Sequence, residues 1–227
     1  MSAGGYNPVY DINWRFFNQQ DEKFWYFAGL VASDGYISEK KISISLQSKD
    51  RLILEKIKEL IQPDKNLYKS EKKNQHRLTI HNIKLAKYMK EIFSMETNNK
   101  GKELRFPKNI PNQYIKDFIR GVFDGDGCID KTKGQQTVDG QKVYYIGLRV
   151  RLFLNKDFLQ ELNEQFRNHY SHRTNAIRKK SGADIHVVTY NFSTAEAFMN
   201  WIYDTNSNLY MIRKRNKYNK LYKKYVS

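Results

Sequence analysis

Two aspartates, Asp34 and Asp126, stand in matching surroundings and are the residues of this chain best placed to do chemistry together. The stretch Phe27-Ala-Gly-Leu-Val-Ala-Ser-Asp-Gly35 aligns with Ile119-Arg-Gly-Val-Phe-Asp-Gly-Asp-Gly127 at one offset of 92 residues, the separation of the two aspartates. The alignment also superposes one glycine inside each stretch and one at its end. An internal repeat predicts two copies of one structural unit.

Each aspartate is predicted to end a helix. Apolar residues recur at three- and four-residue spacing over 24–31 and 115–122, and a glycine follows each aspartate, where a helix commonly stops. Helices that pack through faces without side-chain bulk would bring both aspartates out side by side at one end. Small residues four apart share such a face in each helix: Gly29 with Ser33, and Gly121 with Gly125.

Two adjacent carboxylates at helix C-termini need a positive partner. Each meets the negative end of its helix macrodipole, which disfavours it by a few tenths to about 1 kcal/mol, and the two repel each other. A divalent cation with oxygen ligands, Mg²⁺ above all, removes both penalties and is the usual partner of phosphate chemistry. An Asp-Gly pair alone is an ordinary turn signal, but two copies at matched positions favour a shared chemical role.

The repeated stretch resembles the motif of the LAGLIDADG homing endonucleases, in the monomeric form with two motifs in one chain. The first copy departs from the family pattern at its sixth position, where Ala32 stands and the second copy has Asp124. The eighth position, which carries the catalytic acid in that family, is aspartate in both copies. The resemblance implies a Mg²⁺-dependent endonuclease that makes a double-strand break in DNA during homing of an intron or intein, with Mn²⁺ or Ca²⁺ as substitutes in a structure.

The resemblance also implies the remaining site residues. The backbone carbonyls of Ser33 and Gly125 are expected as extra metal ligands beside Asp34 and Asp126. A polar residue on the first long strand is expected near the reaction, and Gln47 fits it, whereas its counterpart in the second half stays open. One basic residue from each half completes the site: Lys100 and Lys214, with Lys102 and Arg213 as rivals.

Composition supports a polyanionic partner. The chain has 227 residues, with 40 Lys and Arg against 24 Asp and Glu and a net charge of +16, although a solubilising surface or a ribosome-bound protein would share that excess. Aromatic residues at 14% favour a packed globule over a disordered tail. Cys128 is the only cysteine, so a reducing compartment fits. Without a signal-peptide pattern or a membrane-spanning run, we expect a soluble intracellular protein, in cytoplasm, nucleoid or an organelle.

The chain is predicted to be α+β, with an arm (1–21), a first half (22–93), a linker (94–111) and a second half (112–227). Each half reads as a helix, two strands, a helix, two strands and a helix. The resemblance implies two pseudo-symmetric αββαββα units, packed through the motif helices, each presenting a curved antiparallel sheet to DNA. The predicted strands lie at 42–48, 66–72, 76–81, 143–154, 175–180 and 184–192, and an extended hairpin at 131–142 turns at Asp139-Gly140.

A sheet that binds DNA should carry basic and amide side chains at every second residue, because side chains alternate between faces. Arg149 and Arg151 do so between the apolar Leu148, Val150 and Leu152, and arginines can read guanine edges in the major groove. A solvated sheet face is the plain alternative. The other candidates for DNA contact are Ser43, Ser45, Lys69, Arg77, Thr79, His81, Arg178, Lys179, Lys180, His186 and Tyr190.

Two other functions share the fold that the resemblance implies. One is an intron RNA maturase, which nothing in the sequence separates from an endonuclease. The other is a non-catalytic DNA-binding regulator, which has no need to hold two carboxylates together. For the endonuclease we expect double-stranded DNA as the partner, action as a monomer, and neither an obligate protein partner nor a membrane.

Overall fold

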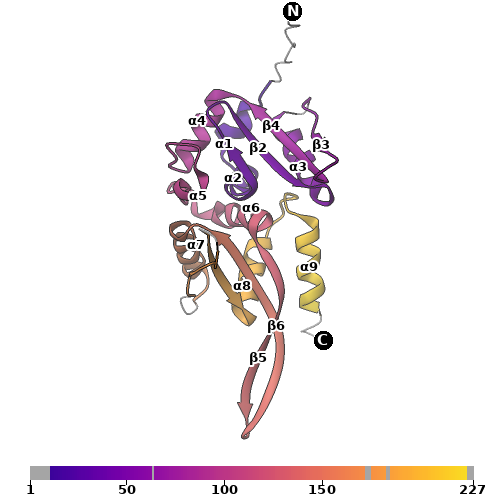
Figure 1. Ribbon diagram of the computed structural model, residues 1–227, viewed down its shortest axis with the longest axis vertical. Helices are drawn as coiled ribbons and strands as arrows, with labels where there is room; N and C mark the ends of the chain where they lie inside the picture. The colour runs from indigo at the N-terminus through magenta and orange to yellow at the C-terminus, as the bar shows by residue number, and fades with distance from the viewer. Residues whose placement is uncertain (1–10, 63, 172–174, 183–184, 224–227) are drawn as a thin grey trace, which may run out of the picture.

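The computed structural model describes residues 11–62, 64–171, 175–182 and 185–223 (Figure 1). The predicted α+β order is confirmed in both halves. The first half contains α2 (Glu22–Asp34), β1 (Gly35–Ile37), β2 (Lys41–Gln47), α3 (Arg51–Ile61), β3 (Tyr68–Ser70), β4 (Gln75–His81) and α4 (Ile83–Ile92). The second contains α6 (Ile115–Asp126), β5 (Cys128–Val138), β6 (Gln141–Leu154), α7 (Lys156–His169), β7 (Arg178–Lys179), β8 (His186–Asn191) and α8 (Phe192–Tyr203).

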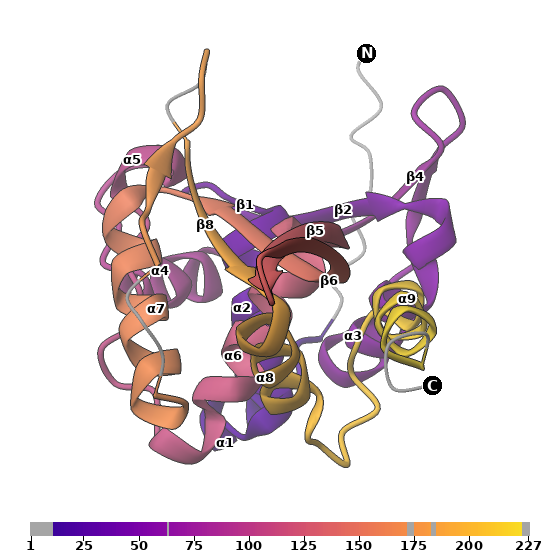
Figure 2. The same ribbon diagram turned by 90° about the horizontal axis from the view of Figure 1, so that it is seen from below.

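Each half builds one antiparallel sheet of the same topology. The strand orders are β1-β2-β4-β3 and β5-β6-β8-β7. Helices cover one side of both sheets, and the other side is left open (Figure 2). In β2 the buried Ile42, Ile44 and Leu46 face the helices, so alternation places the intervening polar residues on the open side, as the sequence predicts.

The two motif helices, α2 and α6, cross at their small residues. A Cβ built on Gly29 would lie 2.0 Å from the carbonyl oxygen of Phe118, and one built on Gly121 would lie 2.2 Å from that of Tyr26. Real side chains never approach backbone so closely, so only glycine permits this contact. The prediction that bare helix faces join the two halves is therefore confirmed.

Three helices lie outside the repeat. α1 (Trp14–Gln19) belongs to the arm, and its Phe16 and Phe17 rings pack edge-on against Phe24 and Phe27 of α2. α5 (Lys100–Glu103) lies in the linker, which the buried side chains of Leu104, Phe106 and Ile110 anchor. α9 (Ile212–Lys223) follows α8 at the end of the second half and contacts the first half, where Arg213 Nη2 lies 2.9 Å from Asp50 Oδ2.

The halves differ most in their first hairpin. β1 has 3 residues and β5 has 11, so β5 and β6 run beyond the body as a two-stranded ribbon (Figure 1). The ribbon turns at Asp139 (φ 51°) and Gly140 (φ 78°), the predicted Asp-Gly turn with both residues in the left-handed region. None of the helices in the described ranges is long and apolar enough to cross a membrane.

Candidate active site

Asp34 and Asp126 are the last residues of α2 and α6 and lie together, as predicted. A Cβ built on Gly125 would lie 1.9 Å from Ser33 Oγ and 3.1 Å from Asp34 Oδ2, which places the Asp34 carboxylate against the last turn of α6. Gly35 and Gly127 end the helices in extended conformation, with φ of −81° and −77°. They are required for space, because a Cβ on either would lie 2.4 Å from a carbonyl oxygen of its own helix.

The surroundings of the two carboxylates disfavour their charged forms. Burial and the charge of Asp126 raise the pKa of Asp34 to about 6, and burial raises the pKa of Asp126. Within the described part of the chain, neither carboxylate accepts a hydrogen bond from a protein donor. Their oxygens are therefore available to a ligand, and a cation there would relieve the repulsion.

Lys100 and Lys214 enter this site in matching ways. The Lys100 ammonium donates to the carbonyls of Ser33 and Gly35, and Lys214 donates to those of Phe123 (2.7 Å), Gly125 (2.9 Å) and Gly127 (2.7 Å). Each lysine thus satisfies the orphan carbonyls at the end of one motif helix, where a cation also complements the macrodipole. Burial lowers the pKa of each lysine to about 8.

The two rival basic residues lie elsewhere. Lys102 is exposed on α5, two residues after Lys100 and so on a different face of the helix. Arg213 pairs with Asp50 of the first half, at 2.9 Å between Nη2 and Oδ2. Of the four candidates, only Lys100 and Lys214 contact the motif helices' ends.

The donors at this site fit a hard divalent cation. Carboxylate oxygens of Asp34 and Asp126 and nearby backbone carbonyls are the ligand type that Mg²⁺ and Ca²⁺ take. The described ranges contain no group of three or more His, Cys, Asp or Glu side chains, so water and substrate oxygens would complete the coordination. The carbonyls of Ser33 and Gly125 accept lysine ammonium groups, yet each oxygen has a second lone pair.

The strand register identifies the counterpart of Gln47. Tyr36 pairs with Ser43 in the first sheet and Cys128 pairs with Arg151 in the second, so Gln47 corresponds to Asn155. Asn155 is already engaged: Oδ1 accepts from the Phe158 N–H at 2.9 Å as the N-cap of α7, and Nδ2 donates to the Leu104 carbonyl at 2.8 Å. Gln47 is exposed at the end of β2, so the two halves differ at this position.

Alternation sorts the candidate DNA contacts into two faces. Directly opposed residues of antiparallel strands share a face, so the pairing registers show which side chains lie on the open side. Arg178 lies on the open side, opposite Val187. The ammonium of Lys180 lies 5.5 Å from the centre of the Phe153 ring, on the same side. The other candidates on the open side are Ser43, Ser45, Arg77, Thr79, His81, Arg149 and Arg151.

Four candidates lie on the helix side of the sheets; the assignment of Tyr190 to DNA is wrong, whereas contact of the other three with DNA stays a prediction. Tyr190 is fully buried, and its hydroxyl bonds Asn163 at 3.0 Å in the core of the second half. His186 shares the face of the buried Val188, and Lys179 lies opposite His186. Lys69 lies opposite His76, on the helix side of β3, and pairs with Glu71.

Asp130 is a residue of the open face that the sequence reasoning missed. It lies opposite Arg149 and forms a bidentate pair with it, at 2.7 and 3.0 Å, and also binds Arg151 at 2.6 Å. The carboxylate fixes both guanidinium groups side by side on the sheet. Once β5 is recognised as a strand, alternation places Asp130 on the same face as Cys128, which is the face of Arg149 and Arg151.

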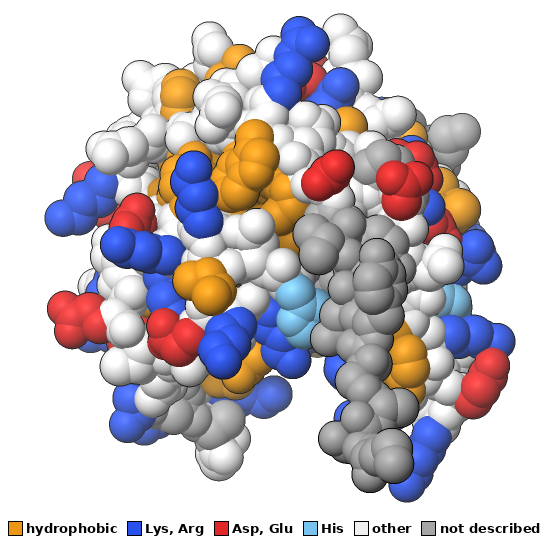
Figure 3. Space-filling model, turned by 90° about the horizontal axis from the view of Figure 1, so that it is seen from above, with side chains coloured by type: hydrophobic (Ala, Val, Ile, Leu, Met, Phe, Trp, Pro, Cys, Tyr) orange, Lys and Arg blue, Asp and Glu red, His pale blue; other side chains and the backbone are white. Residues whose placement is uncertain are grey.

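Basic side chains also lie on the face of the molecule at the end of the first half. Viewed from the end of the first half, Lys and Arg are spread around the whole outline, interspersed with Asp and Glu (Figure 3). The net charge of +16 gives the molecule a general attraction to a polyanion.

The sequence of this chain is similar to one protein family and to parts of several much longer proteins. Residues 21–93 match the family described as LAGLIDADG-like domain. A probable translation initiation factor IF-2 of Thermococcus kodakarensis is 30% identical over 113 residues, which are 48% of this chain and 9% of that protein. A reverse gyrase of Methanocaldococcus jannaschii is 34% identical over 109 residues, again 48% of this chain and 6% of that protein. The chain thus spans less than a tenth of these relatives.

Solved structures share the fold over most of the chain. The I-LtrWI LAGLIDADG homing endonuclease bound to target DNA is similar with a TM-score of 0.59 at 12% identity, over 89% of this chain and 91% of that one. I-SmaMI bound to an uncleaved DNA target with calcium ions gives a TM-score of 0.55 at 14% identity, over 82% and 86%. At such identities the likeness establishes the fold.

Proposed function

We propose that this chain, of which residues 21–93 match the LAGLIDADG-like domain, is a site-specific DNA endonuclease that makes a double-strand break with a divalent cation, Mg²⁺ in the cell. The observation that carries this proposal is the pair Asp34 and Asp126, whose charges are held together at the ends of two crossed helices. Such an arrangement is unfavourable for a protein that only binds DNA, because burying two like charges destabilises the fold. The regulator alternative is disfavoured on this ground.

The residues present would act on a phosphodiester as follows. A cation bound by Asp34 and Asp126 would supply charge for the phosphate oxygens and lower the pKa of an attacking water. Lys100 and Lys214 hold the carbonyls at both helix ends, so they fix the carboxylates in place and bring positive charge near the phosphates. One acid and one lysine at the end of each motif helix fit the cleavage of two strands.

The open faces of the two sheets form the proposed DNA surface. Arginines and polar side chains alternate along β2, β4 and β6 on that side, so they can meet base edges while backbone amides and lysines meet phosphates. The ribbon of β5 and β6 extends this surface in the second half only. Because a major groove admits a two-stranded ribbon, we include it in the proposed contact.

Cleavage of a plasmid library tests the proposal. Supercoiled plasmids carrying random inserts are incubated with the protein and Mg²⁺, and linear products are sequenced to find the target. We expect the wild type to linearise one class of site, and Asp34→Asn and Asp126→Asn to bind that site without making the double-strand break. A wild type that cleaves no sequence with Mg²⁺ or Mn²⁺ would refute the endonuclease. Binding lost in both variants would contradict the metal role.

A further inference from the structure

Asp124, at the sixth position of the second motif, is a fully buried carboxylate. It accepts three hydrogen bonds, from Tyr26 Oη (2.8 Å), Tyr203 Oη (3.0 Å) and the Met211 N–H (2.7 Å). A buried charge is tolerated only when it is hydrogen-bonded in this way. The first motif has Ala32 at the same position, so the fold of a motif helix does not itself require an acid there.

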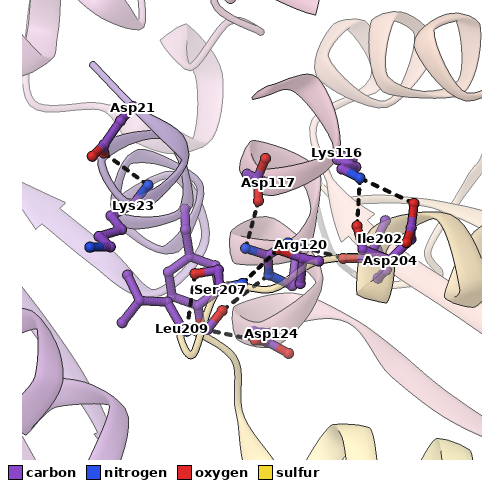
Figure 4. A network of polar contacts seen from close by, with 12 residues as sticks. Asp21, Lys23, Lys116, Asp117, Arg120, Asp124, Ile202, Asp204, Ser207 and Leu209 are labelled. Carbon is purple, nitrogen blue, oxygen red and sulfur yellow. Dashed lines mark hydrogen bonds and ion pairs between the residues drawn. The ribbon is translucent and has the colours of Figure 1, made fainter. Parts of the chain in front are cut away.

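The partners of Asp124 fix the segment that leads from α8 to α9. Tyr203 ends α8 and Met211 directly precedes α9, and both are bound by the one carboxylate. Arg120, one turn earlier on α6, holds the same segment by donating to the carbonyls of Ile202 and Leu209, each at 3.1 Å (Figure 4). Both ends of the segment are therefore attached to the motif helix.

Met211 links this attachment to the active-site lysine. Its N–H donates to the Asp124 carboxylate. Its carbonyl accepts from the backbone N–H groups of Lys214 (3.0 Å) and Arg215 (3.1 Å), and these two bonds form the first turn of α9. The Lys214 ammonium then returns to the carbonyls on either side of Asp124, those of Phe123 and Gly125. The acid thus fixes the start of the helix whose lysine completes the same motif.

The first half positions its lysine by other means. Lys100 lies on the linker helix α5, where the Glu103 carboxylate accepts from the N–H groups of Glu96 and Thr97. The next residues are tied to the first half by a bond from the Arg105 N–H to the Phe93 carbonyl. None of these contacts involves Ala32, which is consistent with the loss of an acid at that position.

We propose that Asp124 is a positioning residue for Lys214, holding the start of α9 so that the ammonium reaches the second-half site. The inference rests on the proposed endonuclease function. It predicts a defect confined to one DNA strand, because the Lys214 ammonium is hydrogen-bonded at the end of α6 and the Lys100 ammonium at the end of α2. A merely structural role would slow both strands together.

Strand-resolved cleavage of a labelled target duplex tests the proposal. We expect Asp124→Asn to slow one strand by about 10- to 100-fold, a typical loss for a group that orients an active-site residue, and to accumulate nicked plasmid. Lys214→Met should slow the same strand, and the matched Lys100→Met the other. In a Lys214→Met background, Asp124→Asn should have no further effect on that strand, because its action passes through the lysine.

Two further variants separate positioning from folding. Tyr203→Phe removes one bond to Asp124 but keeps the Met211 N–H in place, so it should preserve the wild-type ratio of the two strand rates. Insertion of one glycine after Met211 keeps the bond to Asp124 but uncouples α9, so it should reproduce the one-strand defect even if Asp124→Asn does not fold. Equal slowing of both strands by the insertion, or by a folded Asp124→Asn, would overturn the proposal. A wild type that cleaves nothing would instead refute the proposed function.

Discussion

Gly29 and Gly121 face each other where α2 and α6 cross, so closely that a Cβ built on Gly121 would lie 3.0 Å from the Gly29 Cα. Such an approach leaves no room for any side chain between the two backbones. It sets the separation of the helix ends, and so of Asp34 and Asp126, which lie five residues further along each helix. The geometry of the candidate site is therefore fixed by residues that take no part in its chemistry.

Replacing either glycine should destabilise the whole protein. We expect Gly29→Ala and Gly121→Ala each to lower the free energy of unfolding by at least about 3 kcal/mol, because the new methyl meets backbone that cannot move aside. Gly101→Ala is the matched control, since the nearest atom to its Cβ is a side-chain oxygen at 3.8 Å. Urea denaturation measures all three, and wild-type stability in Gly29→Ala would contradict the close contact.

Stability should respond to pH through Asp34. Its pKa rises from 3.8 to about 6 on folding, so the folded state binds the proton more tightly than the unfolded state. The wild type is therefore penalised as pH rises from about 4 to above 6, by about 3 kcal/mol at most, and no penalty remains below about pH 4. Asp34→Asn should be the more stable protein at pH 7.5 without divalent ions, and this gain should vanish at pH 3.5.

Divalent cations provide the control for that prediction. In the proposed function Mg²⁺ binds the ionised pair, so it should stabilise the wild type at pH 7.5 by mass action and have little effect on Asp34→Asn. Thermal unfolding with and without Mg²⁺ measures both. Equal stabilisation of the two proteins would mean that the ion binds elsewhere.

Local patterns in the sequence were enough to predict the repeat, the helix contact and the faces of β2. The small residues of the motifs and the alternation from Ile42 to Leu46 are signals carried by neighbours in the chain. Lys100 and Lys214 came from the resemblance to a family, since no local pattern marks them. Their contacts with the motif helices span 65 to 91 residues.

The errors arose where a register or a distant partner decides the outcome. The sequence predicts a DNA contact for Tyr190 because a basic and aromatic strand looks the same on either face until its pairing with β6 is known. Asn155 escaped notice because its equivalence to Gln47 follows only from the registers of two hairpins. The role of Asp124 depends on partners 79, 87 and 98 residues away.

Removing the ribbon tip should shorten the DNA contact on one side only. Residues 135–144 can be replaced by Asn-Gly, which joins the paired Gly134 and Tyr145 through a two-residue turn. The deletion removes Lys142 and Asp139 together, so the net charge is unchanged and any effect comes from lost contact. Four residue pairs of about 3.4 Å each correspond to about four base pairs of duplex.

Hydroxyl-radical footprinting on the identified target measures this change. We expect the protected region to become about four base pairs shorter at the outer end of the second half-site. Protection of the first half-site should stay unchanged, because β1 is short and offers no such extension. Base preference should relax over the same pairs, because amide side chains such as Gln136 on the open face are lost. An unchanged footprint with intact cleavage would show that the ribbon points away from DNA, because a strand pair lying in the groove must protect the backbone beside it.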